Sequence, residues 1–245
     1  MNAEFGSQMA ESTLARVLNS IRQRISDACV RAGRNESEVT LVAVSKTVSA
    51  ECVRAAIEAG VTILGENRVQ EAEAKLAALA DLRSQVKWHL IGHLQSNKAR
   101  KALSLFDVVQ SVADESIAAR LNRMAEESGK RLPVFIEVNL AGEVSKSGAA
   151  PQQVLPLMTA ISQFPALELQ GLMSVPPFLD NPENVRPFFR QLRALRDEAL
   201  RAGIAPPTCT QLSMGMSHDF EVAIEEGATL VRIGTALFGA RTNTL

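Results

Sequence analysis

The sequence predicts a (β/α)₈ barrel, in which eight parallel strands alternate with helices around a closed sheet. Eight short runs rich in Val, Leu and Ile recur along the 245 residues, and segments with helical spacing separate them. One more helical pattern precedes the first run and can cover the strand that no helix follows. After the first run, Lys46-Thr47-Val48 lacks the glycine-rich turn of a doubly wound open sheet, so the barrel is favoured over that alternative.

The expected strands are short and bounded by turn residues. The first of them is an unbroken apolar run, which is typical of a parallel strand covered on both faces. The eight strands span residues 39–46, 62–67, 86–92, 107–111, 133–140, 167–175, 210–213 and 230–234.

The expected helices carry apolar residues at spacings of three and four. Ser12 or Thr13 can cap the first helix and Ser49 the second, while Gly33 and Gly60 mark where these two helices end. The helices span residues 11–33, 49–60, a segment that ends near 82, then 97–105, 116–129, 151–163, 184–201 and 218–226.

We find no linker or composition shift that would divide the chain. Residues 1–8 have no pattern of their own and precede a second methionine, Met9, so we interpret them as a cloning remnant. The sequence therefore predicts a single barrel domain over residues 9–245, with the first helix as an addition at its N-terminal side.

Composition excludes several classes of protein. Hydrophobic residues make up 46% and charged residues 22%, which is ordinary for a globular protein. No apolar run approaches the roughly 20 residues of a membrane span, and a net charge of -1 gives no reason to bind nucleic acid. Cys29, Cys52 and Cys209 are far apart and show no metal or redox spacing, so we expect a reducing, cytoplasmic environment.

A lysine at the end of the first strand is the first candidate for chemistry. Lys46 should stand where the strand leaves the core, with its stem packed and its amine at the rim. A lysine there can lose its charge by desolvation and attack an aldehyde, although a lysine that merely reaches solvent is the more common case.

The ends of the other strands supply the rest of the candidate site, because barrel sites lie at the carboxyl ends of the strands. Residues 213–217 offer two hydroxyls and a glycine, and Gly234-Thr235 follows the next strand. Adjacent loops after the seventh and eighth strands are the usual phosphate pocket of a barrel. The remaining strand-end residues are Asn67, the stretch 89–93, Asn139, Met173, Ser174 and Arg232.

A phosphate site beside a strand-end lysine is compatible with two chemistries. One is an aldolase that forms a Schiff base with a sugar phosphate. The other is pyridoxal 5′-phosphate (PLP), held by its phosphate and by an imine to Lys46. Arg232 could face the ring nitrogen of PLP, or it could pair with a carboxylate, and spacing does not choose between them.

The sequence closely resembles the PLP homeostasis proteins, also called the YggS or proline synthase co-transcribed family. The resemblance rests on blocks in the same order from about residue 39 to Arg241. These blocks are 42–46 (VAVSK), 65–71 (GENRVQE), 88–98 (WHLIGHLQSNK), 143–148 (EVSKSG), 171–173 (GLM), 212–219 (LSMGMSHD) and 231–235 (VRIGT). The resemblance implies the PLP-binding barrel related to the N-terminal domain of alanine racemase.

The resemblance also implies a role for each matching residue. Lys46 would form the Schiff base, Arg232 would meet the pyridine nitrogen, and Lys146 would be a second, non-covalent contact. The cofactor-binding set implied in this way is Lys46, Asn67, Met173, Ser213, Gly215, Met216, Ser217, Arg232, Gly234 and Thr235. We assign no catalytic role to His89, His93 or His218, and we expect no metal.

The departures from alanine racemase indicate function. That enzyme needs a second domain and a tyrosine base opposite the lysine, whereas this chain contains no tyrosine. Arg232 only donates hydrogen bonds and would favour an unprotonated ring nitrogen, which weakens the electron sink. We therefore expect a monomeric PLP carrier in vitamin B6 homeostasis that can deliver PLP to apo-enzymes. A racemase with Lys46 as its single base is the alternative.

Overall fold

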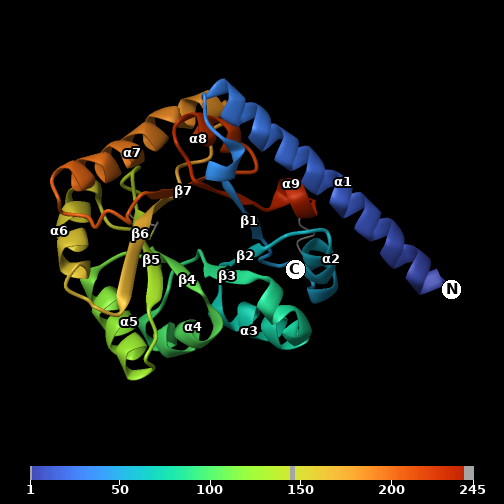
Figure 1. The fold of residues 1–245 in the computed structure, drawn as a ribbon, viewed down its shortest axis with the longest axis horizontal. Coiled ribbons are helices and arrows are strands. Elements are labelled where there is room, and N and C mark those ends of the chain that lie inside the picture. Colours follow the sequence, from blue (N-terminus) through green and yellow to red (C-terminus); the bar gives the residue numbers. More distant parts are fainter. Residues whose placement is uncertain (1, 144–146, 240–245) are drawn as a thin grey trace.

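The chain forms a closed barrel of parallel strands surrounded by helices, as the sequence predicts (Figure 1). The computed structural model describes residues 2–143 and 147–239, with residues 2–12 as backbone only. In chain order the strands are β1 Thr40–Val44, β2 Ile63–Glu66, β3 Lys87–Leu90, β4 Val108–Val112, β5 Leu132–Val138, β6 Leu167–Ser174, β7 Gln211–Met216 and β8 Leu230–Ile233.

The helices follow the expected alternation. They are α1 Asn2–Arg31, α2 Ala50–Glu58, α3 Val69–Ala78, α4 Ala99–Leu105, α5 Glu115–Glu127, α6 Pro151–Ile161, α7 Arg186–Arg201, α8 Phe220–Glu225 and α9 Thr235–Phe238. The Ser49 hydroxyl caps α2 by accepting from Cys52 N–H at 3.3 Å, as predicted. Within the described residues, no helix is both long and apolar enough to cross a bilayer.

Pairing of β1 with β8 closes the barrel. Thr40 lies opposite Leu230, and Val42 lies opposite Arg232, so the first and last strands run side by side. Each remaining strand pairs with its neighbours in sequence order. The carboxyl ends of all eight strands therefore surround one mouth.

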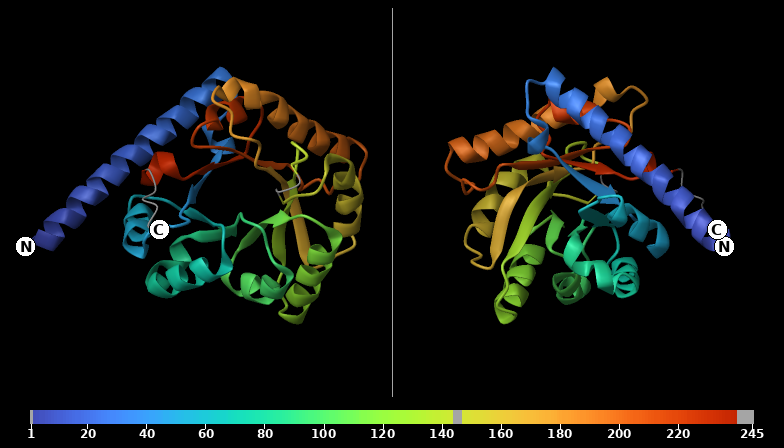
Figure 2. Two further views of the ribbon diagram at one scale, coloured as in Figure 1. Left: turned by 180° about the vertical axis from the view of Figure 1, so that it is seen from behind. Right: turned by 45° about the vertical axis from the view of Figure 1, so that its right-hand side comes forward.

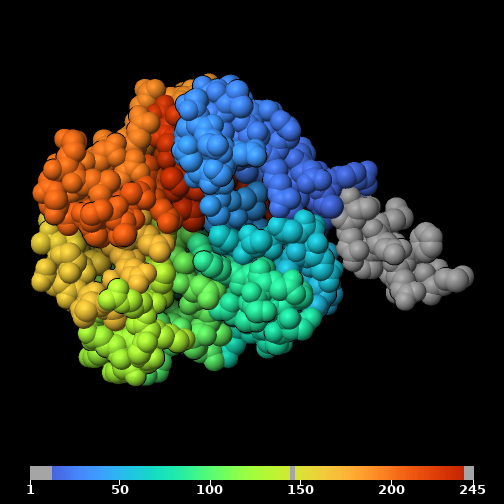
Figure 3. All heavy atoms as spheres, in the orientation of Figure 1, coloured from blue at the N-terminus to red at the C-terminus, as the bar shows by residue number. Residues whose placement is uncertain are grey.

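Helix α1 covers the outside of the barrel where the sequence requires an additional helix. It packs against α8, α2 and α9, and views from two further sides show it outside the ring of helices (Figure 2). In the space-filling view its described part lies beside the cyan segment (Figure 3). Leu18, Ile21 and Ile25 are buried in this contact, and their spacing is part of the pattern that predicted the helix.

The barrel interior has an apolar layer that is separate from the core between sheet and helices. It consists of Val42, Val108, Phe135, Met173 and Leu230, all buried. Because side chains alternate along a strand, the residues two positions further on should also face the interior. Three of these positions carry the polar residues Gln110, Glu137 and Arg232, which belong to the site described below.

Most helix and strand boundaries differ from the prediction by one to three residues, and the larger differences have physical reasons. α1 begins at Asn2, nine residues early. The helix expected to reach residue 82 ends at Ala78, and a 3₁₀ helix follows over Ala80–Gln85. This tighter turn buries Leu79 and Leu82, three residues apart, on one side. The short α9 was not expected.

Strand β7 is longer than predicted because its pairing continues beyond a bulge. After the register shift, Met216 lies opposite Arg232, and Gly215 has a φ of 89°. A Cβ atom on Gly215 would lie 2.5 Å from the Cβ of Ala223 on α8. The glycine is therefore required for the backbone conformation and for the packing of α8 on this strand.

Candidate functional site

Lys46 follows β1 at the carboxyl end of the barrel. β1 ends at Val44, two residues earlier than predicted, and Lys46 follows in a tight turn. Val42 faces the barrel interior, so the alternation of side chains places Val44 and then Lys46 on the same side. The lysine is partly buried, in agreement with the expectation of a packed stem and an amine at the rim.

The loops after β7 and β8 meet at the hydroxyl of Ser217. Its Oγ accepts hydrogen bonds from Gly234 N–H and Ala236 N–H, each at 3.2 Å. Thr235, between these two residues, is exposed. Two main-chain donors and two hydroxyls are thus gathered where the sequence predicted an anion, and a phosphate oxygen fits this set of donors. The neighbouring Met216 N–H instead donates to Asp219 Oδ1 at 2.6 Å.

Ser213 lies deeper than the phosphate prediction supposed. Its side chain is fully buried, and its hydroxyl donates to Gln110 Oε1 at 2.6 Å. The same hydroxyl accepts from an Nη of Arg232 at 2.8 Å. Ser213 is therefore joined to the polar network of the barrel interior.

A chain of hydrogen bonds crosses the barrel beneath the mouth, and Arg232 fixes its direction. Because a guanidinium can only donate, Ser213 must turn its own proton to Gln110 Oε1. The amide nitrogen of Gln110 then donates to His89 Nδ1, at 2.7 Å. Burial lowers the pKa of His89 to about 4, so the ring is neutral near pH 7 and its other nitrogen carries the proton.

Arg232 is 3% exposed and is held by protein oxygens. One Nη donates to Ser213 Oγ, and the other donates to the carbonyl oxygen of Ser174 at 2.7 Å. Burial lowers the pKa of the guanidinium to about 10, while the charges of Asp219 and Glu137 oppose that shift. Arg232 thus remains a cation at neutral pH and is anchored in the barrel interior.

Glu137 is a site residue that the sequence reasoning missed. It lies two residues after Phe135 on the inward face of β5, it is 9% exposed, and its Oε2 has no hydrogen-bond partner in the described part of the chain. Burial raises its pKa to about 7, and the charge of Arg232 only partly opposes this. A single acidic residue in the run 134–138 was the signal that could have found it.

Asn67 and Met173, predicted to flank a ring, lie at different depths. Met173 is fully buried in the apolar layer of the interior, whereas Asn67 is only partly buried, just after β2. Gly92 allows the loop after β3 to approach, since a Cβ there would lie 2.3 Å from the carbonyl oxygen of Asn67. Lys146, the predicted second contact, lies outside the described residues.

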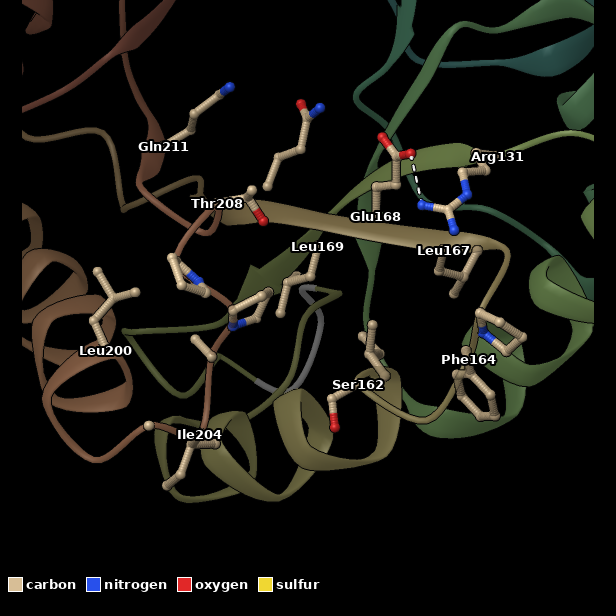
Figure 4. A pocket seen from close by; sticks show the side chains of 17 residues that line it. Arg131, Ser162, Phe164, Leu167, Glu168, Leu169, Leu200, Ile204, Thr208 and Gln211 are labelled. Atoms are coloured by element: carbon tan, nitrogen blue, oxygen red, sulfur yellow. Dashed lines mark ion pairs between the residues drawn. The ribbon is translucent and has the colours of Figure 1, made fainter.

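A large pocket at the opposite end of the barrel does not share these features. It has a volume of about 1240 Å³ and lies at the amino ends of β6 and β7 (Figure 4). Among its lining residues, Arg131 and Glu168 form an ion pair at 3.6 Å. No predicted site residue lines it, so the mouth around Lys46 remains the candidate site.

Comparisons with known proteins agree with this fold. The family described as alanine racemase, N-terminal domain, matches residues 18–242. The pyridoxal phosphate homeostasis protein of Aquifex aeolicus is 46% identical over 225 residues, which cover 91% of this chain and 96% of that protein. The protein of the same name from Pseudomonas aeruginosa is 46% identical over 231 residues, which cover 94% and 96%.

A solved structure is similar over nearly the same length. PipY of Synechococcus elongatus, solved with PLP bound, superposes with a TM-score of 0.81 at 38% identity. The match covers 92% of this chain and all of PipY. The barrel described above is therefore also the fold of a protein that holds PLP.

The buried carboxyl group of Glu137 should make the stability of the protein depend on pH. Its pKa is raised from 4.5 to about 7, so between these values the folded protein holds a proton that the unfolded chain has released. The free energy of unfolding therefore falls as the pH rises through this interval, by at most about 3 kcal/mol. We expect Glu137→Gln to remove this decrease.

Denaturant unfolding of the ligand-free protein from pH 4.5 to pH 8 measures this effect. Glu58→Gln, at an exposed position, is the matched control and should follow the wild type. Parallel profiles for wild type and Glu137→Gln would show that the carboxyl group does not titrate in this range.

Proposed function

Because the chain belongs to the pyridoxal phosphate homeostasis protein family, we propose that it binds PLP reversibly through Lys46 and takes part in intracellular PLP homeostasis. The observation that carries this proposal is the shared mouth of the barrel. Lys46 follows β1, the donors around Ser217 follow β7 and β8, and β8 lies between β7 and β1 in the closed sheet. An aldehyde that carries a phosphate matches both parts of this site.

The proposed covalent step is condensation of an amine with an aldehyde. The lone pair of the Lys46 Nζ attacks the aldehyde carbon of PLP, a C=N bond replaces C=O, and the oxygen leaves as water with the two amine protons. Hydrolysis reverses this reaction without any other reactant.

The phosphate would be held mainly by the loops that follow β7 and β8. We propose that Ser217, Gly234 and Thr235 contact it, together with Ala236 N–H, and that Gly215 and Met216 shape the first of these loops. The two N–H groups that converge on Ser217 support this assignment. A phosphate oxygen would accept from the same donors at modest structural cost.

The ring would lie over the buried polar network. We propose that Arg232 faces the pyridine nitrogen and that Asn67 and Met173 contact the ring from the rim and from below. Ser213 would act through Arg232, since its hydroxyl accepts from the guanidinium and donates to Gln110. This proposal replaces a direct phosphate contact for Ser213 with a role in orienting the arginine.

We propose a carrier, with racemisation at most a weak side activity. The chain contains no tyrosine to serve as a second acid–base group. Bound PLP would stabilise negative charge on a substrate carbon best with a protonated ring nitrogen, and a cationic Arg232 disfavours that proton. The names of the curated relatives point in the same direction.

We also propose that the protein works as a cytoplasmic monomer and hands PLP to apo-enzymes. Three free cysteines support a reducing compartment, and two of them, Cys29 and Cys209, are buried. A reversible imine at an open barrel mouth supports transfer.

The covalent link predicts a spectroscopic difference between two lysine variants. Lys46→Ala should lose the visible absorbance band of the imine and the borohydride-trapped adduct, and it should unfold at the wild-type temperature without PLP, because the lysine is not part of the packed core. Lys98→Ala removes another lysine near the same mouth and should keep the band. An adduct that persists in Lys46→Ala would assign the link to a different residue.

The phosphate contacts predict a second difference, between two serines. Ser217→Ala should weaken PLP binding by about 1–3 kcal/mol, the usual cost of a hydrogen bond to a charged group, and should leave binding of pyridoxal unchanged. Ser213→Ala should weaken both ligands by a similar factor, because it disturbs Arg232. Titrations of both ligands measure these ratios. Equal PLP affinity in Ser217→Ala and wild type would locate the phosphate elsewhere.

The carrier proposal predicts slow chemistry on amino acids. Incubation of the PLP-loaded protein with L-alanine in deuterated water should give α-hydrogen exchange and D-alanine at well below about 1 s⁻¹, the lower end of ordinary enzyme turnover. Both products are followed in one assay by NMR and chiral chromatography. Turnover within the ordinary enzyme range would restore the racemase.

A further inference from the structure

A buried cluster of charged side chains lies on the outer side of the sheet, directly behind Lys46. Glu66 at the end of β2 is fully buried, and Lys75 on α3 is 6% exposed. The Lys75 Nζ contacts Glu66 Oε1 at 2.7 Å and Glu71 Oε1 at 2.8 Å. The proposed PLP contacts use none of these three residues.

The cluster binds the residues on both sides of Lys46. On one side, Ser45 Oγ donates to Glu66 Oε1 at 2.7 Å, and the Lys75 Nζ donates to the carbonyl oxygen of Ser45. On the other side, Thr47 N–H donates to Glu71 Oε1. The backbone before and after Lys46 is therefore attached to one ionic group.

The turn held in this way is one that the sequence alone would not favour. Val48 N–H donates to the Ser45 carbonyl oxygen at 3.0 Å, which closes a β-turn with Lys46 and Thr47 at its centre. Thr47 has a φ of 63° and is the one non-glycine residue with positive φ in the described part of the chain. Positive φ at this turn position is the pattern of a type II turn, which favours glycine, and it is strained for a β-branched residue.

A strained backbone persists only where surrounding contacts stabilise it, and such strain gathers at functional sites. Here the stabilising contacts are identifiable, because Glu71 holds the N–H of the strained residue and Lys75 holds the carbonyl oxygen that begins the turn. Burial strengthens these ionic contacts relative to the same contacts in water. Without the contacts to Glu71 and Lys75, the turn could relax and the Lys46 side chain would change direction.

We propose that Lys75, with Glu66 and Glu71, is a positioning cluster that holds the Ser45–Val48 turn so that Lys46 points at the aldehyde of PLP. This inference rests on the proposed function of Lys46 and adds residues behind the sheet to it. The cluster touches neither PLP nor the reacting nitrogen, and it acts through the backbone. Its removal should slow formation of the imine more than it weakens binding of the phosphate and ring.

The test compares Lys75→Met with Lys101→Met. Lys101 lies on α4 and forms an ion pair at the surface with Glu73 of α3, the helix that carries Lys75. Lys101→Met therefore removes an ion pair between a lysine and α3 without touching the turn. Imine formation is followed by stopped-flow absorbance after mixing with PLP. Binding of pyridoxine 5′-phosphate, which has an alcohol in place of the aldehyde, reports the rest of the site.

We expect Lys75→Met to slow imine formation at least tenfold with affinity for pyridoxine 5′-phosphate within twofold of wild type. Lys101→Met should change neither quantity. A wild-type rate in Lys75→Met overturns the positioning proposal, and so does an equal loss of rate and of pyridoxine 5′-phosphate affinity. A wild-type protein that forms no imine on Lys46 would instead refute the proposed function.

A second substitution tests whether Lys75→Met slows imine formation through the turn. It also keeps the test possible if Lys75→Met does not fold. Thr47→Gly removes the strain, because glycine takes a positive φ at little cost. In the Lys75→Met background, Thr47→Gly should raise the rate of imine formation at least threefold. If Lys75→Met alone does not fold, Thr47→Gly should restore folding. No recovery in a folded double variant would assign the effect of Lys75 to something other than the turn, and would overturn the proposal.

Discussion

Closure of the barrel by β1 and β8 is the constraint on which the site depends. The pairing sets Val42 beside Arg232 and brings the first strand next to the loop that follows the last one. Lys46 and the proposed phosphate-binding loop near residue 235 are far apart in sequence, and an open sheet with another strand order would separate them. In a closed parallel barrel both must open toward the same mouth.

Two polar networks lie on opposite sides of the sheet, one at Ser45 and the other on the side of Lys46. The alternation of side chains along β1 keeps them apart. Ser45 contacts Glu66 and Lys75 on the outer side of the sheet, and the alternation of side chains assigns Lys46 to the inner side. Arg232, Ser213 and their partners lie on the inner side, over the apolar layer of the interior. The sheet keeps the two systems apart, so the backbone around Lys46 can be fixed from outside without charged groups competing for the space inside.

Much of the fold could be predicted because it depends on local periodicity. Apolar runs and helical spacing located all eight strands and the helices between them. The extent of β7 could not be predicted in this way, because it depends on a bulge at Gly215 that is paired with β8 and packed by α8. The break after Ala78 likewise depends on how Leu79 and Leu82 meet the core.

The residues of the candidate site also differ in how far sequence position alone predicts them. Lys46, Ser217 and the residues 234–235 stand at strand ends, where position alone indicates a role. Ser213 resembled them in sequence, yet its hydroxyl is committed to Gln110 and Arg232, and only a three-dimensional structure shows that. Glu137 and Lys75 were missed because a buried charge is recognised from its surroundings, which come from distant segments. For Thr47, no residue pattern indicates a positive φ.

The arrangement favours a site that is ready before its ligand arrives. Arg232 is fixed by Ser174 and Ser213, and the N–H groups of Gly234 and Ala236 converge on Ser217, so the proposed site needs little ordering when a ligand binds. A preformed site usually implies slow release, which a carrier has to avoid. The proposed link to Lys46 resolves this conflict, since hydrolysis breaks it whenever water reaches the mouth. Lys46 is only partly buried and Thr235 is exposed, so water has access. The buried hydrogen-bond networks hold the residues of the proposed site in place, and access of water at the rim makes the proposed imine reversible.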